Sequence, residues 1–337
     1  MELVRLGIIG AGFMGGIHAR VASALPGVEI VGVSDTDPAR AAALAAQYGG
    51  RSFAEHGAML DSVRPAAVLI CTPETEHLRP GCDAARRGCH VFMEKPLAST
   101  LADADAIIGA CAQAGVQLMT GYILRFEACY AAVQSAVAHG EIGRVLTVYA
   151  RRNATIEEGR RLGGRTSVVN YLAVHDIDQM LWQRPERKVR TVRAHAVDGR
   201  LKAETGVSDF VWITMEFDDG SLGAVECGWA MTEGWGGFSD VKMNVIGTDG
   251  VLTLDFNPMN LVKVTRDHGW TYPETRHWPL VNDRLGGAAL LEISHFVECV
   301  RQGTKPLVDG RDGRRSLEIA IAAEQSIVQG REVSLPA

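Results

Sequence analysis

The sequence predicts an α/β domain on a doubly wound parallel sheet, followed by an α+β domain with a large open, mostly antiparallel sheet. Over about the first 120 residues, short apolar runs alternate with helical patterns, which is the rhythm of a parallel sheet covered by helices. After Tyr122 this rhythm gives way to long strands that follow one another through tight turns. We therefore expect two domains, residues 1–122 and 123–337.

The elements of the first domain follow from apolar runs and from the residues that end helices. Asp37 and Pro38 are suited to start a helix that Gly49 ends, and Gly115 suits the left-handed position after another helix. The expected strands are Val4–Ile9, Glu29–Ser34, Ala67–Cys71, His90–Met93 and Val116–Thr120. The other expected helices are Met14–Leu25, Thr75–Arg87 and a helix capped by Ser99 that runs to Ala114.

In the second domain, a period of two marks the strands most clearly. Val211, Ile213 and Met215 alternate with more polar residues, and Asp218-Asp219-Gly220 is a typical hairpin turn. The expected strands are Arg144–Arg151, Thr191–Val197, Val207–Phe217, Ser221–Ala230, Asp240–Ile246, Val251–Asp255 and Leu261–Thr265. The expected helices are Glu127–Ala138, Val168–Trp182, Ala288–Arg301 and Gly313–Gln329, with a glycine- and arginine-rich loop before the second.

The open sheet needs cover on both faces. Helices would cover one face, so we expect the other to join copies of the chain into a homodimer or homotetramer.

Composition narrows the class of protein. The chain has 337 residues, is 47% hydrophobic and has a net charge of -6, which gives no reason to expect a nucleic-acid partner. It begins without the basic region of a signal peptide, and the apolar run Ala66–Cys71 is too short to cross a membrane. The seven cysteines include no CxxC pair, so we expect reduced thiols, no metal site and a cytoplasmic protein.

A glycine motif marks the expected ligand site of the first domain. The motif is Gly10-Ala11-Gly12-Phe13-Met14-Gly15, and it lies between a strand and a helix. Gly10 allows a tight turn, and Gly12 allows the backbone to approach a pyrophosphate. Gly15 allows the helix to pack closely on the strand. Asp35 ends the second strand and can accept hydrogen bonds from a ribose while it repels a 2′-phosphate. The pattern therefore predicts a Rossmann domain that binds NAD. NADP is less favoured, although Arg40 could reach a phosphate.

Further strings carry a family resemblance. They are Thr72-Pro73-Glu74-Thr75-Glu76-His77, Glu94-Lys95-Pro96, Tyr122-Ile123-Leu124-Arg125-Phe126, His175-Asp176-Ile177-Asp178, Pro306-Leu307-Val308-Asp309-Gly310 and Gly330-Arg331-Glu332-Val333. With the glycine motif, they make the chain resemble the glucose–fructose oxidoreductase/inositol dehydrogenase/MocA family over essentially its whole length. The resemblance implies hydride transfer between nicotinamide and a secondary alcohol of a sugar, an inositol or a related polyol.

Placement and resemblance together indicate the reacting groups. Lys95 follows a parallel strand at the sheet edge where such folds bind ligands, and the family uses this lysine to hold the substrate oxygen and help move its proton. The resemblance makes His175 the acid/base, a role that suits imidazole. Many members carry an aspartate four residues before this histidine, where this chain has Tyr171, with Asn170 one step further back. We expect Tyr171 to assist His175.

The remaining expected ligands are weaker inferences. Thr72, Pro73, His77 and Glu94 join the glycine motif as expected cofactor ligands, and Arg125 is an expected substrate ligand. In the arginine-rich segment, Arg160 and Arg165 are either solvated loop residues or a clamp for a substrate carboxylate such as a uronate.

Three other functions stay open on the sequence. Some relatives hold NAD tightly and oxidise a sugar only transiently, as lyases or glycosidases that release no NADH. A non-catalytic nucleotide or sugar sensor is a second alternative, which the presence of both Lys95 and His175 disfavours. A reductase of imines or enones is the third.

Overall fold

The chain forms two compact units. The structure is a computed structural model that describes residues 2–336 except 233, 236–238, 257–260, 268 and 272. The N-terminal unit comprises Met1–Glu127 together with Arg276–Arg314, and the C-terminal unit comprises Ala128–Thr275 together with Arg315–Ala337. The segment Arg276–Arg314 thus belongs with the first domain although it follows most of the second in sequence.

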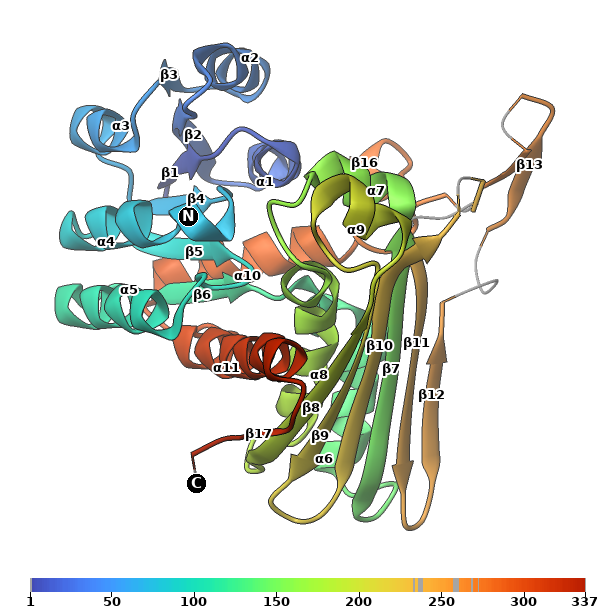
Figure 1. The fold of residues 1–337 in the computed structure, drawn as a ribbon. Helices are drawn as coiled ribbons and strands as arrows, with labels where there is room; N and C mark the ends of the chain where they lie inside the picture. The colour runs from blue at the N-terminus through green and yellow to red at the C-terminus, as the bar shows by residue number, and fades with distance from the viewer. Residues whose placement is uncertain are drawn as a thin grey trace. The chain divides into compact units, whose positions relative to one another are not determined.

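The N-terminal unit contains a six-stranded parallel sheet in the order β3-β2-β1-β4-β5-β6, which confirms the doubly wound fold (Figure 1). Its strands are β1 (Val4–Ile9), β2 (Val28–Ser34), β3 (Arg51–Phe53), β4 (Ala67–Ile70), β5 (His90–Glu94) and β6 (Leu118–Gly121). Its helices are α1 (Phe13–Ala24), α2 (Pro38–Tyr48), α3 (His56–Val63), α4 (Leu78–Arg86), α5 (Leu101–Ala114) and α10 (Ala288–Gln302). The strand order reverses between β1 and β4, and ligands of such sheets bind beyond the carboxyl ends at this point.

Most of the residues that were expected to start or end these helices do so. The side chain of Asp37 accepts hydrogen bonds at the start of α2, and Gly115 has a φ of 67° after α5. The expected cap Ser99 was wrong, because Thr100 accepts the bond from the backbone N–H of Asp103. The short elements β3 and α3 were not expected. Two single-turn 3₁₀ helices (Glu74–Glu76 and Ile123–Phe126) and the hairpin β15 (Leu280–Val281) and β16 (Arg284–Leu285) complete the unit.

The C-terminal unit contains a seven-stranded, mostly antiparallel sheet in the order β12-β11-β7-β10-β9-β8-β17, in which only β7 and β10 run parallel. Its strands are β7 (Val145–Thr155), β8 (Val189–Val197), β9 (Phe210–Phe217), β10 (Leu222–Met231), β11 (Ser239–Gly247), β12 (Val251–Asp255) and β17 (Val333–Ser334). Its helices are α6 (Ala128–Ala138), α7 (Ile156–Leu162), α8 (Val174–Gln183), α9 (Arg200–Thr205) and, from Arg315 on, α11 (Gly310–Gln329).

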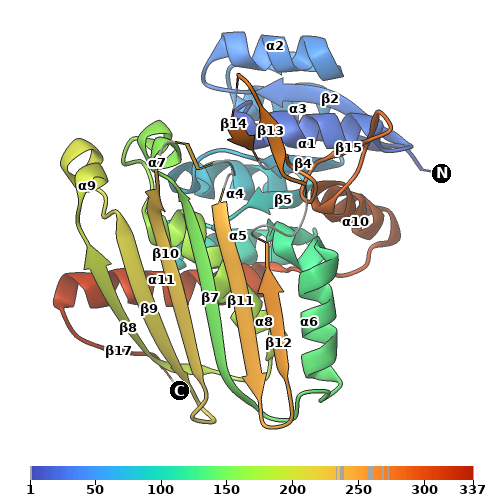
Figure 2. The same cartoon turned by 90° about the vertical axis from the view of Figure 1, so that its right-hand side faces the viewer.

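The helices lie over one face of this sheet. Figure 2 shows α8 and α11 behind the strands, and α8 contacts β7 and β10. The alternate side chains Val211, Ile213 and Met215 of β9 are buried on that side, as their period of two predicts. In the part of the chain that the structure describes, no helix covers the opposite face of the strands (Figure 2).

Three expectations for this unit needed correction. The arginine-rich loop contains a short helix, α7, and the start of the expected helix Val168–Trp182 is a π-helical turn (Val169–Ala173) that leads into α8. The expected strand Leu261–Thr265 is shorter and lies outside the large sheet. It forms β13 (Lys263–Thr265), which pairs only with β14 (Gly269–Thr271) among the described strands.

Candidate active site

The glycine turn between β1 and α1 has the shape that a pyrophosphate requires. Gly10 has a φ of 97°, and a Cβ there would lie 2.8 Å from the backbone of Cys71. A Cβ on Gly15 would lie 2.0 Å from the carbonyl oxygen of Gly10, whereas a Cβ on Gly12 would meet no atom within 4 Å. No side chain caps the N-terminus of α1. The turn is thus closely packed behind and open in front, where the N–H groups of α1 can bind an anion.

Asp35 is fixed beside this turn. Its carboxylate accepts hydrogen bonds from the backbone N–H groups of Ala11 at 2.7 Å and of Asp37 at 2.8 Å. The side chain is half-buried at the end of β2. A carboxylate held here suits ribose hydroxyls and disfavours a 2′-phosphate, so the site fits NAD.

His77 links the loops that follow β4 and β5. Its Nε2 lies 2.9 Å from the carbonyl oxygen of Thr72, and its Nδ1 lies 3.1 Å from that of Leu97. Burial lowers the pKa of this imidazole, so the neutral ring donates to one of the two carbonyls at a time. Thr72, Pro73 and His77 therefore lie beside the glycine turn at the carboxyl end of β4, and His77 holds the backbone there through its two hydrogen-bonded carbonyls.

Lys95 and Glu94 lie at the carboxyl end of β5, as expected from the sequence. Lys95 is half-buried, and its peptide bond to Pro96 is cis. The buried carboxylate of Glu94 accepts a hydrogen bond from the backbone N–H of Lys95 at 3.1 Å. Glu94 thus supports the turn that carries Lys95.

Phe13, Met14 and Arg125 are the remaining expected ligands in this unit, and they differ in how far they are buried. Phe13 is 60% exposed at the start of α1, and its ring contacts that of Trp278 at 5.9 Å, while Met14 is half-buried. The guanidinium of Arg125 is buried, lies 3.4 Å from Asp312 and donates to the carbonyl oxygen of Leu307. These contacts fix Arg125 within the N-terminal unit, and its binding of substrate stays a prediction.

In the C-terminal unit, His175 is the second residue of α8, which directly follows the π-helical turn. Both His175 and Tyr171 are half-buried. The Tyr171 hydroxyl donates to Glu158 at 2.5 Å, and its ring contacts that of Trp229 at 5.4 Å. Burial, followed by the bond to Glu158, raises the pKa of Tyr171 well above its usual value. Tyr171 is therefore a hydrogen-bond donor rather than a proton acceptor at neutral pH.

Glu158 and Asn170 were not counted among the candidate site residues from the sequence, although both lie close to Tyr171 in the chain or in space. Arg161 pairs with Glu158 through two bonds and reaches the Tyr171 hydroxyl at 3.3 Å, so Glu158 brings a carboxylate beside the position of the family aspartate. Asn170 has a buried side-chain oxygen without a hydrogen-bond partner. Asn170 lies one residue before Tyr171, within the π-helical turn that leads into the helix of His175.

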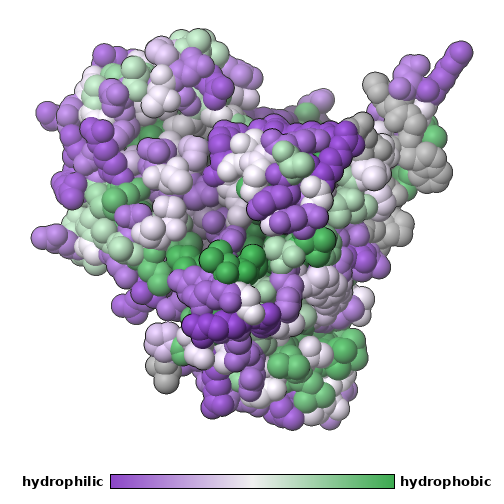
Figure 3. All heavy atoms as spheres, in the orientation of Figure 1, coloured by the Kyte–Doolittle hydropathy of each residue, from purple (hydrophilic) through white to green (hydrophobic). Residues whose placement is uncertain are grey.

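Arg160 and Arg165 are engaged within the helices of the former loop. Arg160 binds both carboxylate oxygens of Glu204 on α9, and Arg165 donates to the carbonyl oxygens of Arg161 and Leu162 at the end of α7. Figure 3 shows the strongly hydrophilic surface over α7 and α9. Both arginines therefore have partners within their own unit, and the carboxylate clamp stays a prediction.

A buried ion pair fixes α8 to the sheet beside His175. Arg152 on β7 donates to Asp176 through Nε at 2.7 Å and Nη2 at 3.0 Å, and Nη2 also reaches Tyr130 at 3.1 Å. Asp176 is fully buried. The residue after His175 is thus held in one geometry, which orients the start of α8.

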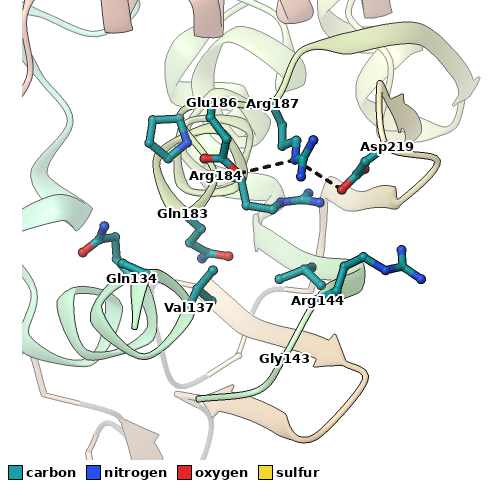
Figure 4. A pocket seen from close by; sticks show the side chains of 12 residues that line it. Gln134, Val137, Gly143, Arg144, Gln183, Arg184, Glu186, Arg187 and Asp219 are labelled. Carbon is teal, nitrogen blue, oxygen red and sulfur yellow. Dashed lines mark ion pairs between the residues drawn. The ribbon is translucent and has the colours of Figure 1, made fainter. Parts of the chain in front are cut away.

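A polar pocket lies at the opposite end of α8 (Figure 4). It has a volume of about 380 Å³ and is lined by Arg144, Arg184 and Arg187 among others. Arg184 is 4% exposed and stacks over Phe217 at 3.9 Å, while Arg187 pairs with Glu186 and Asp219. The pocket residue Gln183 is eight residues beyond His175 along the helix, or about 12 Å, so this pocket is separate from the candidate site.

Two searches of the described residues bear on other kinds of site. They contain no cluster of three His, Cys, Asp or Glu side chains that could hold a metal ion. None of the described helices is long and apolar enough to span a bilayer. All seven cysteines are free thiols.

The glycine turn, Asp35 and the half-buried Lys95 at one sheet edge define a nicotinamide-dinucleotide-dependent oxidoreductase. Family models agree: one described as "Oxidoreductase family, NAD-binding Rossmann fold" matches residues 4–122, and one described as "Oxidoreductase family, C-terminal alpha/beta domain" matches residues 134–335. The chain belongs to the Gfo/Idh/MocA oxidoreductase family.

Similar proteins are known as dehydrogenases. The chain is 28% identical to scyllo-inositol 2-dehydrogenase (NAD(+)) of Bacillus subtilis, over 98% of this chain and 96% of that protein. It is 29% identical to D-apiose dehydrogenase of Paraburkholderia graminis, over 97% and 88%. A crystal structure of a putative myo-inositol dehydrogenase from Sinorhizobium meliloti superposes with a TM-score of 0.81 at 26% identity, over 99% of this chain and 100% of that one.

Proposed function

We propose that this protein is a cytoplasmic NAD-dependent dehydrogenase that reversibly oxidises a secondary alcohol of a sugar, an inositol or a related polyol. The observation that carries the proposal is the arrangement of the N-terminal unit, where the glycine turn and the Lys95 turn follow parallel strands at one sheet edge. The printed activities of the relatives, on inositols and on D-apiose, support polyhydroxylated substrates.

In this proposal, residues 1–122 bind NAD and residues 123–337 bind the substrate. The cofactor supplies the hydride acceptor. Lys95 donates a hydrogen bond to the reacting oxygen and stabilises its developing negative charge. His175 accepts the hydroxyl proton as the alcohol becomes a carbonyl, so the hydride and the proton leave in separate directions. The reverse reaction returns the proton from His175 to the oxygen.

Tyr171 has a supporting role here. Because its hydroxyl already donates to Glu158, we assign it to orienting the substrate face near His175 rather than to proton abstraction. Arg125 and Arg165 are retained as predicted substrate ligands. Their paired guanidinium groups make them the weakest members of the proposed site.

The test is NADH formation by purified protein with NAD across inositols, aldoses, uronates and glycosides. We expect turnover with at least one polyol that is reduced at least about a hundredfold in Lys95→Ala. The matched control is Lys305→Ala, which removes a lysine that pairs with Asp309 outside the site. Turnover of Lys95→Ala equal to that of the parent would refute the role of Lys95. Product formation without NADH would replace the dehydrogenase by the transient-redox alternative.

We also propose a homodimer or homotetramer that forms through the uncovered sheet face. Exposed apolar side chains lie along the strands there, including Trp212 at 41% and Leu222 at 53%. Next to them Tyr149 stacks on Trp212 at 6.2 Å and donates to Glu226. A two-fold axis would place such a mixed apolar and hydrogen-bonded surface against itself.

Light scattering on Trp212→Glu tests this interface. A buried charge should lower the molecular mass of the particle in solution by at least half. Val328→Glu, at an 85% exposed position of α11, is the control that should leave the mass unchanged. An oligomer that survives Trp212→Glu would contradict the proposed interface.

A further inference from the structure

A buried polar cluster lies beneath the turn that carries Lys95. It consists of His18 on α1, Glu94 on β5 and Glu292 on α10, whose exposed fractions are 0%, 7% and 1%. Residues of this kind are rarely placed in a core unless they are paired, since burial of an unpaired charge is costly. The proposed reaction assigns no task to His18 or Glu292.

One carboxylate in this cluster holds two elements at once. Oε1 of Glu94 lies 2.6 Å from Nε2 of His18, and Oε2 accepts the backbone N–H of Lys95 at 3.1 Å. Nδ1 of His18 is buried and has no hydrogen-bond partner, so the proton that the ring shares with Glu94 is on Nε2. The helix that starts at the glycine turn is therefore joined through one side chain to the backbone of Lys95.

The surroundings leave Glu94 little freedom. The ring of Phe92 meets that of His18 edge-on at 5.1 Å and restricts the imidazole. On the β6 side, a Cβ on Gly121 would lie 3.4 Å from Cδ of Glu94, which is van der Waals contact. Packing from its own strand, from the neighbouring β6 and from α1 thus restricts the carboxylate.

Two other titratable groups near Glu94, Glu292 and Cys71, have raised pKa values. Burial, together with the nearby charge of Glu94, raises the pKa of Glu292 well above its usual value. The thiol of Cys71 at the end of β4 also has a strongly raised pKa, mainly through burial. The raised pKa keeps Glu292 neutral near neutral pH, which avoids repulsion between two neighbouring carboxylates.

We propose that His18 is a positioning residue for the catalytic lysine, which acts by locking Glu94 against the Lys95 backbone. The inference rests on the proposed function, in which Lys95 contacts the reacting oxygen. A small displacement of such a contact lowers the rate far more than the affinity for substrate. A purely structural His18 would instead contribute to stability and leave the turnover of folded enzyme unchanged.

The experiment compares His18→Gln with His18→Asn. The amide nitrogen of glutamine reaches the place of Nε2 and can still donate to Glu94, whereas that of asparagine reaches only the place of Nδ1. We expect kcat with the best polyol to fall at least about tenfold further in His18→Asn than in His18→Gln, at similar KM and NAD affinity. Thermal unfolding confirms that each variant is folded.

A double-variant cycle tests whether His18 acts through Glu94. Glu94→Gln should lower kcat about as much as His18→Asn, and the double variant should lose no more than either single variant. His56→Asn is the matched control, because His56 forms a similar pair with Asp83 on α3 and α4 at 3.1 Å, and it should keep the parent kcat.

Each outcome decides the inference. Equal kcat in His18→Gln and His18→Asn, or additive losses in the double variant, would overturn it. Failure of the proposed function is recognised separately, because it would appear as undiminished turnover in Lys95→Ala.

Discussion

At the residue scale, the glycines of the nucleotide turn have different tasks. Gly15 faces the backbone of Gly10, while the space in front of Gly12 is open. Gly12→Ala should therefore fold normally but weaken NAD binding at least about tenfold, because the new methyl group occupies the space of the pyrophosphate. Titration of NAD by fluorescence measures this. Gly16→Ala, also with open space at Cβ, should bind NAD like the parent. Equal affinities of the two variants would contradict the assignment of Gly12.

Tyr171 and His175 should respond very differently to removal of their polar groups. The raised pKa of Tyr171 and its bond to Glu158 leave it unable to accept a proton near neutrality. We expect Tyr171→Phe to lower kcat only about two- to fivefold, whereas His175→Asn should lower it at least about a hundredfold. Steady-state kinetics with a saturating polyol compares the two. A hundredfold loss in Tyr171→Phe would make the tyrosine the acid/base.

Glu292 should make stability depend on pH. Its pKa is raised in the folded state, so it contributes stability that is fully present below its unfolded pKa and is lost as pH rises through the folded pKa. The glutamine of Glu292→Gln cannot ionise. The Tm of this variant should therefore rise relative to the Tm of the parent as the pH increases from about 5. The exposed Glu298→Gln on the same helix is the control. A Tm difference that is constant from pH 5 to 9 would show that Glu292 stays ionised.

At the scale of elements, one ion pair connects α8 to its sheet. Arg152 and Asp176 are buried and doubly hydrogen-bonded, so removal of one partner leaves an unpaired charge in the core. Arg152→Ala should lower the free energy of unfolding by about 3–5 kcal/mol, as urea denaturation would measure. Lys242→Ala, which breaks the more exposed pair with Asp255, should cost much less. Similar losses in both variants would contradict a special role for the buried pair.

Long elements were predictable because their signals are local. The apolar run of β1, the Asp37 cap of α2 and the two-residue period of β9 need only neighbours in sequence. The helix α7 was missed because its seven residues are mostly charged and its contacts, such as the pair of Arg160 with Glu204, are with a distant segment. The cap at Thr100 shows the ordinary one-residue error at a helix boundary.

The site itself was predictable only in part. Gly10, Asp35, Lys95 and His175 stand in recognisable strings, and the structure gives the N-terminal ones a common sheet edge. Glu158 carries no motif, because it reaches Tyr171 from another helix. His18 could have been suspected, since it is a histidine on the helix of the glycine motif, but its partner Glu94 lies 76 residues away.

At the scale of the whole molecule, the chain order does not follow the units. Residues Arg276–Arg314 return to the N-terminal unit, where Phe296 of α10 packs on Phe92 at 5.7 Å and Glu292 lies near Glu94. A helical pattern alone cannot reveal the unit to which a late helix belongs, because that depends on contacts between distant segments. The surroundings of Glu94 thus include a segment almost 200 residues further along the chain.

The central claim is hydride transfer from the carbon that bears the oxidised hydroxyl. The most direct measurement uses the best polyol from the panel, carrying deuterium at that carbon, and follows the label by NMR with NAD present. The account predicts deuterium at C4 of the nicotinamide in stoichiometric NADH, with the corresponding ketone as product. Label that stays in the sugar or exchanges with water, without NADH, would contradict the claim and indicate a reaction without net oxidation.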